Sequence, residues 1–240
     1  MYFSGIQIPD ELMRALRANE VVFFCGAGVS FPPPSSLPMF DGLARDIAGV
    51  ATLPPNEKED AFLGRLSSKG MDVHELAARN LLKRDSKPTD LHYDLLRLFI
   101  KPEQVRVVTT NFDKHFSTAN TKIFRKKKAA EHIAPTLPLG NDFSGIVYLH
   151  GAAATSHRNL VLTDEDFGEA YITRGWARRF LIPLFQRYVV VFVGYSHRDV
   201  TMTYLARGLA SFSPRKRYAL SMDGEPTNDY ERWQSLDVEV

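Results

Sequence analysis

The stretch Val21-Val22-Phe23-Phe24-Cys25-Gly26-Ala27-Gly28-Val29-Ser30 places five apolar residues directly before a Gly-x-Gly turn. An unbroken apolar run of this kind is typical of a strand that is covered on both faces, as in a parallel sheet. Glycines at such a turn let the backbone approach a phosphate closely, and free N–H groups at the start of the next helix then bind the anion.

This glycine motif departs from the dinucleotide-binding fingerprint at two points. The fingerprint has a third glycine where this chain has Phe31. It also has a second strand about twenty residues later that ends in an acidic residue, and this chain has a proline-rich stretch instead. The motif alone therefore leaves two interpretations open: a phosphate-binding turn, or a tight strand-to-helix turn without a ligand.

The rest of the chain alternates further β-rich runs with helical patterns. Strands are predicted at residues 105–109, 146–149, 188–193, 217–222 and 236–240. Apolar residues at helical spacing predict helices over residues 9–18, 90–100, 175–187 and 199–210. Thr89 or Asp90 can cap the second helix, and Pro183 should kink the third or mark its start. This alternation predicts an α/β fold with a doubly wound, mostly parallel, Rossmann-like sheet.

A helical module is predicted between the first two of these strands. Apolar helical stretches occupy residues 43–50, 61–66 and 73–82, and Pro54-Pro55 interrupts them. No convincing strand lies between residues 40 and 100. We therefore predict one domain over residues 1–240, with residues 40–100 as a helical insertion after the first strand.

Composition excludes several classes of protein. The 240 residues hold 30 Lys and Arg against 28 Asp and Glu, and this balance gives no general case for nucleic-acid or membrane binding. The single cysteine, Cys25, excludes an internal disulfide or a cysteine zinc cluster, and we expect it to be a small buried hydrophobe. No signal-peptide pattern or membrane-length apolar run is present. We expect a soluble protein from a reducing compartment such as the cytoplasm.

One dense charge cluster stands out in this balanced chain. Arg125 is followed by Lys126, Lys127 and Lys128. We interpret the cluster as a solvated loop or helix face, with a contact to a phosphate or a partner protein as the alternative.

Polar residues end two of the predicted strands. Asn111 and Asp113 follow the second strand, and His150 follows the third. In open parallel sheets, ligands collect just beyond the carboxyl ends of the strands. Gly26, Asn111, His150 and Gly194 each occupy that place on a separate strand. Their combination predicts a ligand site at this edge of the sheet.

Two polar residues beyond Gly194 extend this prediction. Ser196 could donate a hydrogen bond to a phosphate or a ribose. Asp199 has two interpretations, because it could cap the helix predicted after it or contact the ligand.

Together these motifs resemble those of the sirtuin family. Residues 26–30 read Gly-Ala-Gly-Val-Ser, like the family's Gly-Ala-Gly-x-Ser, and residues 149–151 read Leu-His-Gly, like its catalytic His-Gly. Leu37-Pro38-Met39-Phe40 lies where sirtuins have Ile-Pro-Asp-Phe. Thr110-Asn111-Phe112-Asp113 lies where they have Gln-Asn-x-Asp, and Gly194-Tyr195-Ser196 resembles their Gly-Thr-Ser loop. The motifs follow the family order and span residues 21–199.

The resemblance implies a set of site residues. Asn111 would hold the ribose hydroxyls and the attacking water, and His150, with an ordinary pKa of about 6.5, would be the general base. Asp113, the third catalytic residue, would orient the Asn111 loop or lie near the nicotinamide ribose. No metal is expected. The implied contacts to NAD are Gly26, Ala27, Gly28, Ser30, Phe40, Thr110, Gly194, Tyr195, Ser196 and Asp199.

Departures from the family pattern bear on the reaction. Sirtuin deacylases carry a zinc module built on two Cys-x-x-Cys pairs, which a chain with one cysteine cannot form. Met39 replaces the motif's Asp, Asp41 replaces the Arg that usually follows its Phe, and Thr110 replaces its Gln. These changes weaken a deacylase interpretation, because the acyl-lysine groove depends partly on the zinc module.

The same departures agree with the divergent, sirtuin-like effectors of bacterial anti-phage defence. Those proteins are NAD glycohydrolases, and the resemblance implies that this chain depletes cellular NAD in abortive infection. An NAD-dependent protein deacylase and a non-catalytic NAD- or ADP-ribose-sensing module remain alternatives. Because the chain ends in a strand-like run, we expect an effector domain that forms homo-oligomers and works with a fused or separate sensor or activator. Direct nucleic-acid binding and membrane association are not expected.

Overall fold

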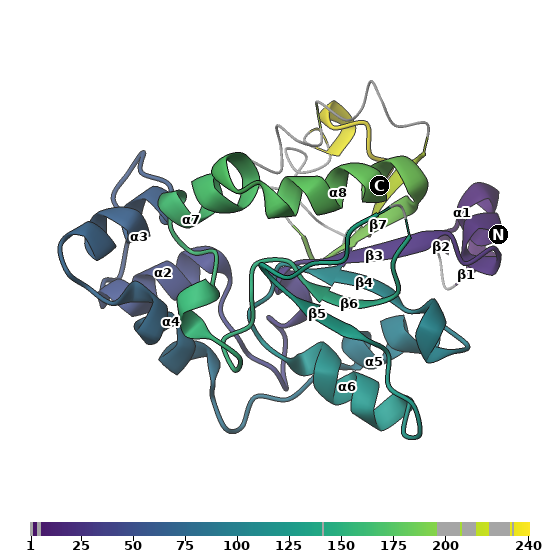
Figure 1. Cartoon of the computed structure of the whole chain (residues 1–240), viewed down its shortest axis with the longest axis horizontal. Coiled ribbons are helices and arrows are strands. Elements are labelled where there is room, and N and C mark those ends of the chain that lie inside the picture. The colour runs from purple at the N-terminus through teal and green to yellow at the C-terminus, as the bar shows by residue number, and fades with distance from the viewer. Residues whose placement is uncertain are drawn as a thin grey trace.

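A computed structural model describes residues 2–3, 6–140, 142–195, 207, 215–220, 231 and 233–240. Its centre is a parallel sheet of six strands in the order β5-β6-β4-β3-β7-β8 (Figure 1). The strands are β3 (Val21–Cys25), β4 (Arg106–Thr109), β5 (Glu131–Ile133), β6 (Gly145–Tyr148), β7 (Val189–Val193) and β8 (Arg217–Leu220). The predicted α/β class with a Rossmann-like parallel sheet is confirmed.

Strand β3 is the axis of this sheet. It pairs with β4 on one side and with β7 on the other, and every one of its residues is buried. Cys25 at its end is fully buried, which agrees with its interpretation as a small hydrophobe. Its burial also raises the pKa of the thiol well above the ordinary value.

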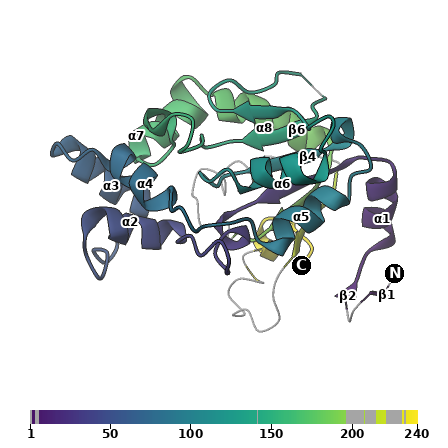
Figure 2. The same cartoon turned by 90° about the horizontal axis from the view of Figure 1, so that it is seen from below.

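Helices cover the sheet on both faces. On one face, α8 (Trp176–Arg187) packs Phe180, Leu181, Leu184 and Phe185 against the cluster that includes Phe24. On the other face lie α1 (Asp10–Arg17), α5 (Asp90–Arg97) and α6 (His115–Ile123). Figure 2 shows α5 and α6 side by side along the sheet. Two covered faces explain why the central strands are continuously apolar.

The helical insertion has a small core of its own. Its helices are α2 (Phe40–Ala48), α3 (Glu59–Ser68) and α4 (Val73–Leu81), and no strand lies between residues 40 and 100. Phe112, which follows β4, and Leu160 and Leu162, which follow β6, complete that core. The module therefore lies against the carboxyl edge of the sheet (Figure 1).

Shorter elements complete the described chain. A two-stranded antiparallel ribbon precedes α1, and a π-helical turn separates α7 from α8. Among the described residues, no helix is long and apolar enough to cross a membrane. These elements are β1 (Tyr2–Phe3), β2 (Ile6–Gln7), η1 (Ala27–Val29), η2 (Pro102–Gln104), η3 (His157–Asn159), α7 (Asp164–Gly168) and η4 (Glu169–Thr173).

Three local predictions differ from the structure or fall outside it. Pro183 lies inside α8 and does not begin it, because the apolar side chains around it pack on the sheet. The strand predicted at 236–240 is reduced to one bridge from Glu239 to Tyr218, since Asp237 adopts a left-handed φ of 57° that breaks the extended run. The helix predicted at 199–210 lies outside the described residues, apart from Arg207.

Candidate active site

Asn111 and His150 end two adjacent strands in matching register. Thr109 of β4 pairs with Tyr148 of β6, so each site residue lies two positions beyond a paired residue. Asn111 is 7% exposed and His150 is 5% exposed. The carboxyl edge of the sheet thus holds both side chains below the surface, as the sequence pattern predicts.

Ser30 is the centre of the polar network around Asn111. Its hydroxyl donates to Asp113 Oδ2 over 2.8 Å and accepts from Asn111 Nδ2 over 3.2 Å. A third partner, His92 Nε2, lies 3.3 Å from the same oxygen. One donated and two accepted hydrogen bonds use the full capacity of a hydroxyl group. This hub joins the turn after β3 to the loop after β4.

His92 belongs to this network, and sequence reasoning did not single it out. The Thr89 N–H donates to His92 Nδ1 over 3.1 Å, so Nδ1 is an acceptor and the ring proton lies on Nε2, facing Ser30. Burial lowers the pKa of His92 to about 4, which agrees with a neutral ring. The sequence held one sign of this role: His92 lies on the same side of the predicted helix as the apolar Leu95 and Leu96.

Asp113 connects the network to the next helix. Its Oδ1 accepts the N–H of His115 over 2.9 Å, while Oδ2 accepts from Ser30. His115 begins α6, so the carboxylate holds the turn between β4 and that helix. In this geometry Asp113 orients the loop that carries Asn111, one of the two roles implied by the resemblance.

His150 has a different environment, dominated by aromatic rings. Its Nε2 lies 2.8 Å from the hydroxyl of Tyr171, and its ring meets that of Phe167 edge-on, with 5.2 Å between centroids. Tyr171 belongs to the π-helical turn, a rare element that is frequent at functional sites. Burial lowers the pKa of His150 to about 3, so the ordinary value expected from the sequence does not hold here.

The two glycine turns pack directly on each other. A Cβ on Gly194, whose φ is +58°, would lie 2.6 Å from the Val29 nitrogen, and one on Gly28 would lie 2.8 Å from the Gly194 oxygen. Glycine is therefore required by contact between the two backbones, before any ligand is considered. This contact favours the tight turn without a ligand, one of the two interpretations that the sequence leaves open.

The turn after β3 also differs from the predicted helix start. It is a single 3-10 turn, η1, and its amides are largely used within the chain. The N–H groups of Gly26, Gly28, Val29 and Ser30 donate to the carbonyls of Val193, Gly194, Gly26 and Ala27, respectively. An anion at this turn would therefore meet fewer available donors than at a regular helix N-terminus.

The other predicted contacts to NAD have varied positions. The Thr110 N–H donates to the Cys25 carbonyl, which ties the ends of β3 and β4 together. Phe40 packs on the core of the helical insertion, and Tyr195 packs on Phe24 with 5.3 Å between ring centroids. Ser196 and Asp199 lie outside the described residues. Within those that are described, no group of three or more His, Cys, Asp or Glu could hold a metal ion.

Three comparisons relate this chain to known proteins. A family model described as "SIR2-like domain" matches residues 105–240, the range that includes Asn111, Asp113 and His150. The "Uncharacterized protein y4cA" of Sinorhizobium fredii (strain NBRC 101917 / NGR234) is 31% identical over 268 residues, which cover 100% of this chain and 22% of that protein. The chain thus spans about a fifth of the length of this relative.

A solved structure gives the third comparison. It is described as "Structural Basis for the Mechanism and Regulation of Sir2 Enzymes" and shares 15% sequence identity with this chain. The alignment has a TM-score of 0.44 and covers 95% of this chain and 98% of the other.

Proposed function

Because the chain belongs to the SIR2-like domain family, we propose that it is an NAD glycohydrolase that cleaves NAD to nicotinamide and ADP-ribose. The observation that carries this proposal is the pair Asn111 and His150, buried at register-matched ends of adjacent parallel strands. An amide and an imidazole at this edge can orient ribose hydroxyls and a water molecule without a metal.

The reaction makes modest demands on the protein. Hydrolysis breaks the bond between ribose C1′ and the nicotinamide nitrogen, and the electron pair leaves with neutral nicotinamide. A water oxygen bonds to C1′ and one proton is released. The transition state resembles an oxocarbenium ion, so the site must orient the ribose, tolerate positive charge and place the water.

Asn111 suits the orienting role because its side chain is already held. Its Nδ2 donates to Ser30, and its backbone N–H donates to Thr109 Oγ1 over 3.0 Å. These bonds leave the amide Oδ1 to accept from a ribose hydroxyl or from the attacking water. We assign the placement of the ribose and the water to Asn111, with Asp113 holding its loop.

His150 suits a site that develops positive charge. Its lowered pKa keeps the ring neutral near pH 7, so it adds no repulsion beside a cationic transition state. A neutral imidazole can still accept a hydrogen bond from a ribose hydroxyl or from water. The Tyr171 hydroxyl at its Nε2 fixes the direction of the ring. We assign to His150 the acceptance of that hydrogen bond alone, because an imidazole with so low a pKa is a weak proton acceptor near pH 7.

Binding of the rest of NAD is assigned to the carboxyl edge of the sheet. The two glycine turns after β3 and β7 meet there, and the Ser30 hub lies beside them. We propose that the diphosphate lies along residues 26–30 and the adenosine beside Gly194 and Tyr195, with Ser196 and Asp199 completing that side.

Hydrolysis is favoured over protein deacylation by one feature of the sequence. The sole cysteine, Cys25, lies fully buried in the central strand, so this chain cannot supply the four thiolates of a sirtuin zinc module. That module supports the acyl-lysine groove in sirtuin deacylases, whereas hydrolysis needs only NAD and water.

We further propose that the domain depletes cellular NAD in abortive infection and is switched on by a fused or separate sensor, as a homo-oligomer in the cytoplasm. The relative from Sinorhizobium fredii agrees with a fused arrangement, because the matching region makes up about a fifth of a longer protein. An enzyme that destroys NAD needs such control, since constant activity would harm its own cell.

The decisive experiment is chromatography of the products formed from NAD. The protein is incubated with NAD in its full-length or partner-bound form, and nicotinamide, ADP-ribose and cyclic ADP-ribose are quantified. We expect equal amounts of nicotinamide and ADP-ribose. His150→Ala and Asn111→Ala should each lower the rate at least about a hundredfold. His157→Ala, at the surface in η3, is the matched control and should keep the wild-type rate.

Other outcomes would contradict the proposal in distinct ways. Product formation only with an acyl-lysine peptide would indicate a deacylase. Calorimetric binding of NAD without nicotinamide release in the activated assembly would indicate a sensor. A wild-type rate in folded His150→Ala protein would refute the role of that residue, and circular dichroism with thermal unfolding checks the fold of each variant.

A further inference from the structure

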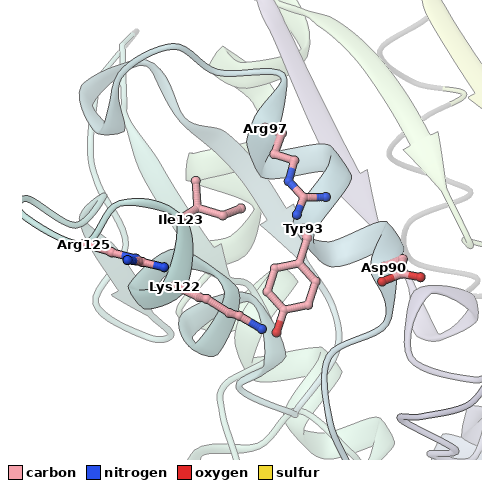
Figure 3. A pocket seen from close by; sticks show the side chains of 6 residues that line it. All are labelled: Asp90, Tyr93, Arg97, Lys122, Ile123 and Arg125. Atoms are coloured by element: carbon pink, nitrogen blue, oxygen red, sulfur yellow. The ribbon is translucent and has the colours of Figure 1, made fainter.

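A cavity lies between helices α5 and α6, on the face of the sheet opposite α8. Its volume is about 390 Å³, within the range of pockets that hold small-molecule ligands. Figure 3 shows side chains from α5 and from the end of α6 converging on it. The lining residues are Asp90, Tyr93, Arg97, Lys122, Ile123 and Arg125.

The lining of this cavity carries more positive than negative charge, on side chains that reach the solvent. Three positively charged side chains, Arg97, Lys122 and Arg125, face one carboxylate, Asp90. Arg97 is partly neutralised by Asp94, with 2.7 Å between its Nη1 and Oδ1. Within the part of the chain that the structure describes, Lys122 and Arg125 make no ion pair with a carboxylate. An anion would therefore bring charge compensation that the chain itself does not supply.

Tyr93 gives the cavity a flat aromatic surface. The Arg97 guanidinium carbon lies 5.8 Å from the centroid of its ring, and the Lys122 ammonium nitrogen lies 5.1 Å from it. Ile123 adds an apolar side chain to the lining. The cavity thus combines a planar, partly apolar surface with cations at its rim, a combination that suits a ring carrying a phosphate.

We propose that this cavity binds a phosphorylated small molecule of nucleotide type. Arg97, Lys122 and Arg125 bind the phosphate, and the base or sugar lies beside Tyr93 and Ile123. The forked guanidinium groups can each donate two parallel hydrogen bonds to phosphate oxygens, and the lysine adds a point charge. This assignment gives a role to Arg125, the first residue of the basic cluster. Lys127 does not line the cavity and forms an ion pair with Glu103 instead.

The cavity is separate from the candidate active site, yet it shares helices with it. Tyr93 follows His92 directly, and the latter faces Ser30 in the polar network. Helix α6 begins at His115 beside Asp113 and ends near Lys122 and Ile123. A ligand that bridges α5 and α6 therefore holds both helices whose first turns support the Asn111 loop. Binding itself does not depend on the proposed reaction.

The test is a titration of the isotope-labelled full chain with 5′-AMP, followed by amide correlation spectra and calorimetry. Amide signals of residues 90–97 and 122–125 should shift together and saturate. Lys122→Gln/Arg125→Gln should weaken binding about tenfold or more, because two charge-assisted contacts are lost. Lys83→Gln/Arg84→Gln, which removes two exposed charges elsewhere, should bind AMP as the wild type does.

Three results would overturn the assignment. One is a set of shifts confined to residues 26–30, which would place AMP at the NAD site. Another is equal affinity in the two double variants. The third is a single-stranded oligonucleotide that binds far more tightly than AMP with a steep salt dependence, which would identify a nucleic-acid surface. Inorganic phosphate should bind more weakly than AMP. If the two bind equally well, Tyr93 does not contact the base or sugar.

Discussion

The ends of β4 and β6 are neighbours in the sheet, yet they hold their site residues in opposite ways. Asn111 is fixed by a saturated set of hydrogen bonds centred on Ser30. His150 is fixed by one hydrogen bond to Tyr171 and by aromatic rings around it. The two histidines of these surroundings, His92 on α5 beside Ser30 and His150 after β6, have lowered pKa values because they are buried.

This difference places two chemical environments, one polar and one aromatic, at the same edge of the sheet. The polar side can orient a substrate, because each of its groups already has a fixed direction before the ligand arrives. We propose that the aromatic side keeps the imidazole of His150 neutral, which favours a reaction in which positive charge develops. The two sides should therefore respond differently when a single polar atom is removed.

The largest effect is expected from Ser30→Ala on the polar side. This change removes the acceptor of Asn111 and His92 and the donor to Asp113, and it leaves buried polar groups unsatisfied. We expect a loss of roughly 3 kcal/mol in the free energy of unfolding, measured by urea denaturation.

Tyr171→Phe on the aromatic side is the matched control for that variant, because it also removes one hydroxyl and keeps the remaining packing. The expected loss is about 1 kcal/mol. Equal losses in Ser30→Ala and Tyr171→Phe would mean that the two sides are not organised differently.

A separate effect, spread over several pH units, is expected when the pH is lowered. In the unfolded chain His150 and His92 titrate near pH 6.5, whereas in the folded chain they titrate at about 3 and about 4. The unfolded state therefore binds more protons, and stability falls as the pH drops below about 6.5. Each histidine should contribute a slope of up to about 1.4 kcal/mol per pH unit.

His150→Gln and His92→Gln should each reduce this slope, and the double variant should reduce it by the sum. Direct titration of the ring signals by NMR separates the two sides further. Asp113→Asn should lower the pKa of His92 again, since the nearby carboxylate raises it, and should leave His150 unchanged. If the rings of His92 and His150 protonate near pH 6.5 in the folded protein, burial does not lower their pKa values.

The smallest effect on stability is expected from the contact between helix α4 and the segment that follows His150. The carbonyl of His150 accepts from Val161, and the segment that follows is tied to helix α4 by His74 Nε2 and Asp166 Oδ2, 2.9 Å apart. The hydrogen bond to Asp166 raises the pKa of His74. Stabilisation from this pair is complete below about pH 6.5 and is lost as the pH rises through the raised value.

His74→Gln should therefore cost about 0.5–1 kcal/mol near pH 6 and less near pH 9, as measured by thermal unfolding at the two values. Ser30→Ala gives the comparison, because its effect should persist at both. A cost that is the same at both pH values would show that His74 acts by packing alone.

Much of the fold was predictable, and the exceptions have physical causes. The apolar runs of β3, β4, β6 and β7 identify strands covered on both faces, since only a buried strand can remain apolar on both sides. Helix α6 escaped prediction because its first residues, such as Ser117 and Thr118, favour helices weakly. Packing of Phe116 and Ala119 into the core stabilises it instead.

The candidate site was predictable in part for the same reason. Asn111 and His150 were accessible to sequence reasoning, because a polar residue directly after a buried strand must lie at the edge of the sheet. His92 was not, because it lies on α5 in the middle of a helical pattern and its partner Ser30 is 62 residues away. Tyr171 was missed for a similar reason, since its π-helical turn has no reliable sequence signal.

The sequence by itself determined the central strands β3, β4, β6 and β7 and the residues at their ends, since these follow from local apolar runs and the polar residues that stop them. Tertiary structure decided what those residues can do. The contact between the glycine turns, the hydrogen bonds that meet at Ser30 and the lowered pKa of His150 all depend on groups far apart in the chain. Burial and distance, which arise only on folding, set the strength of those interactions.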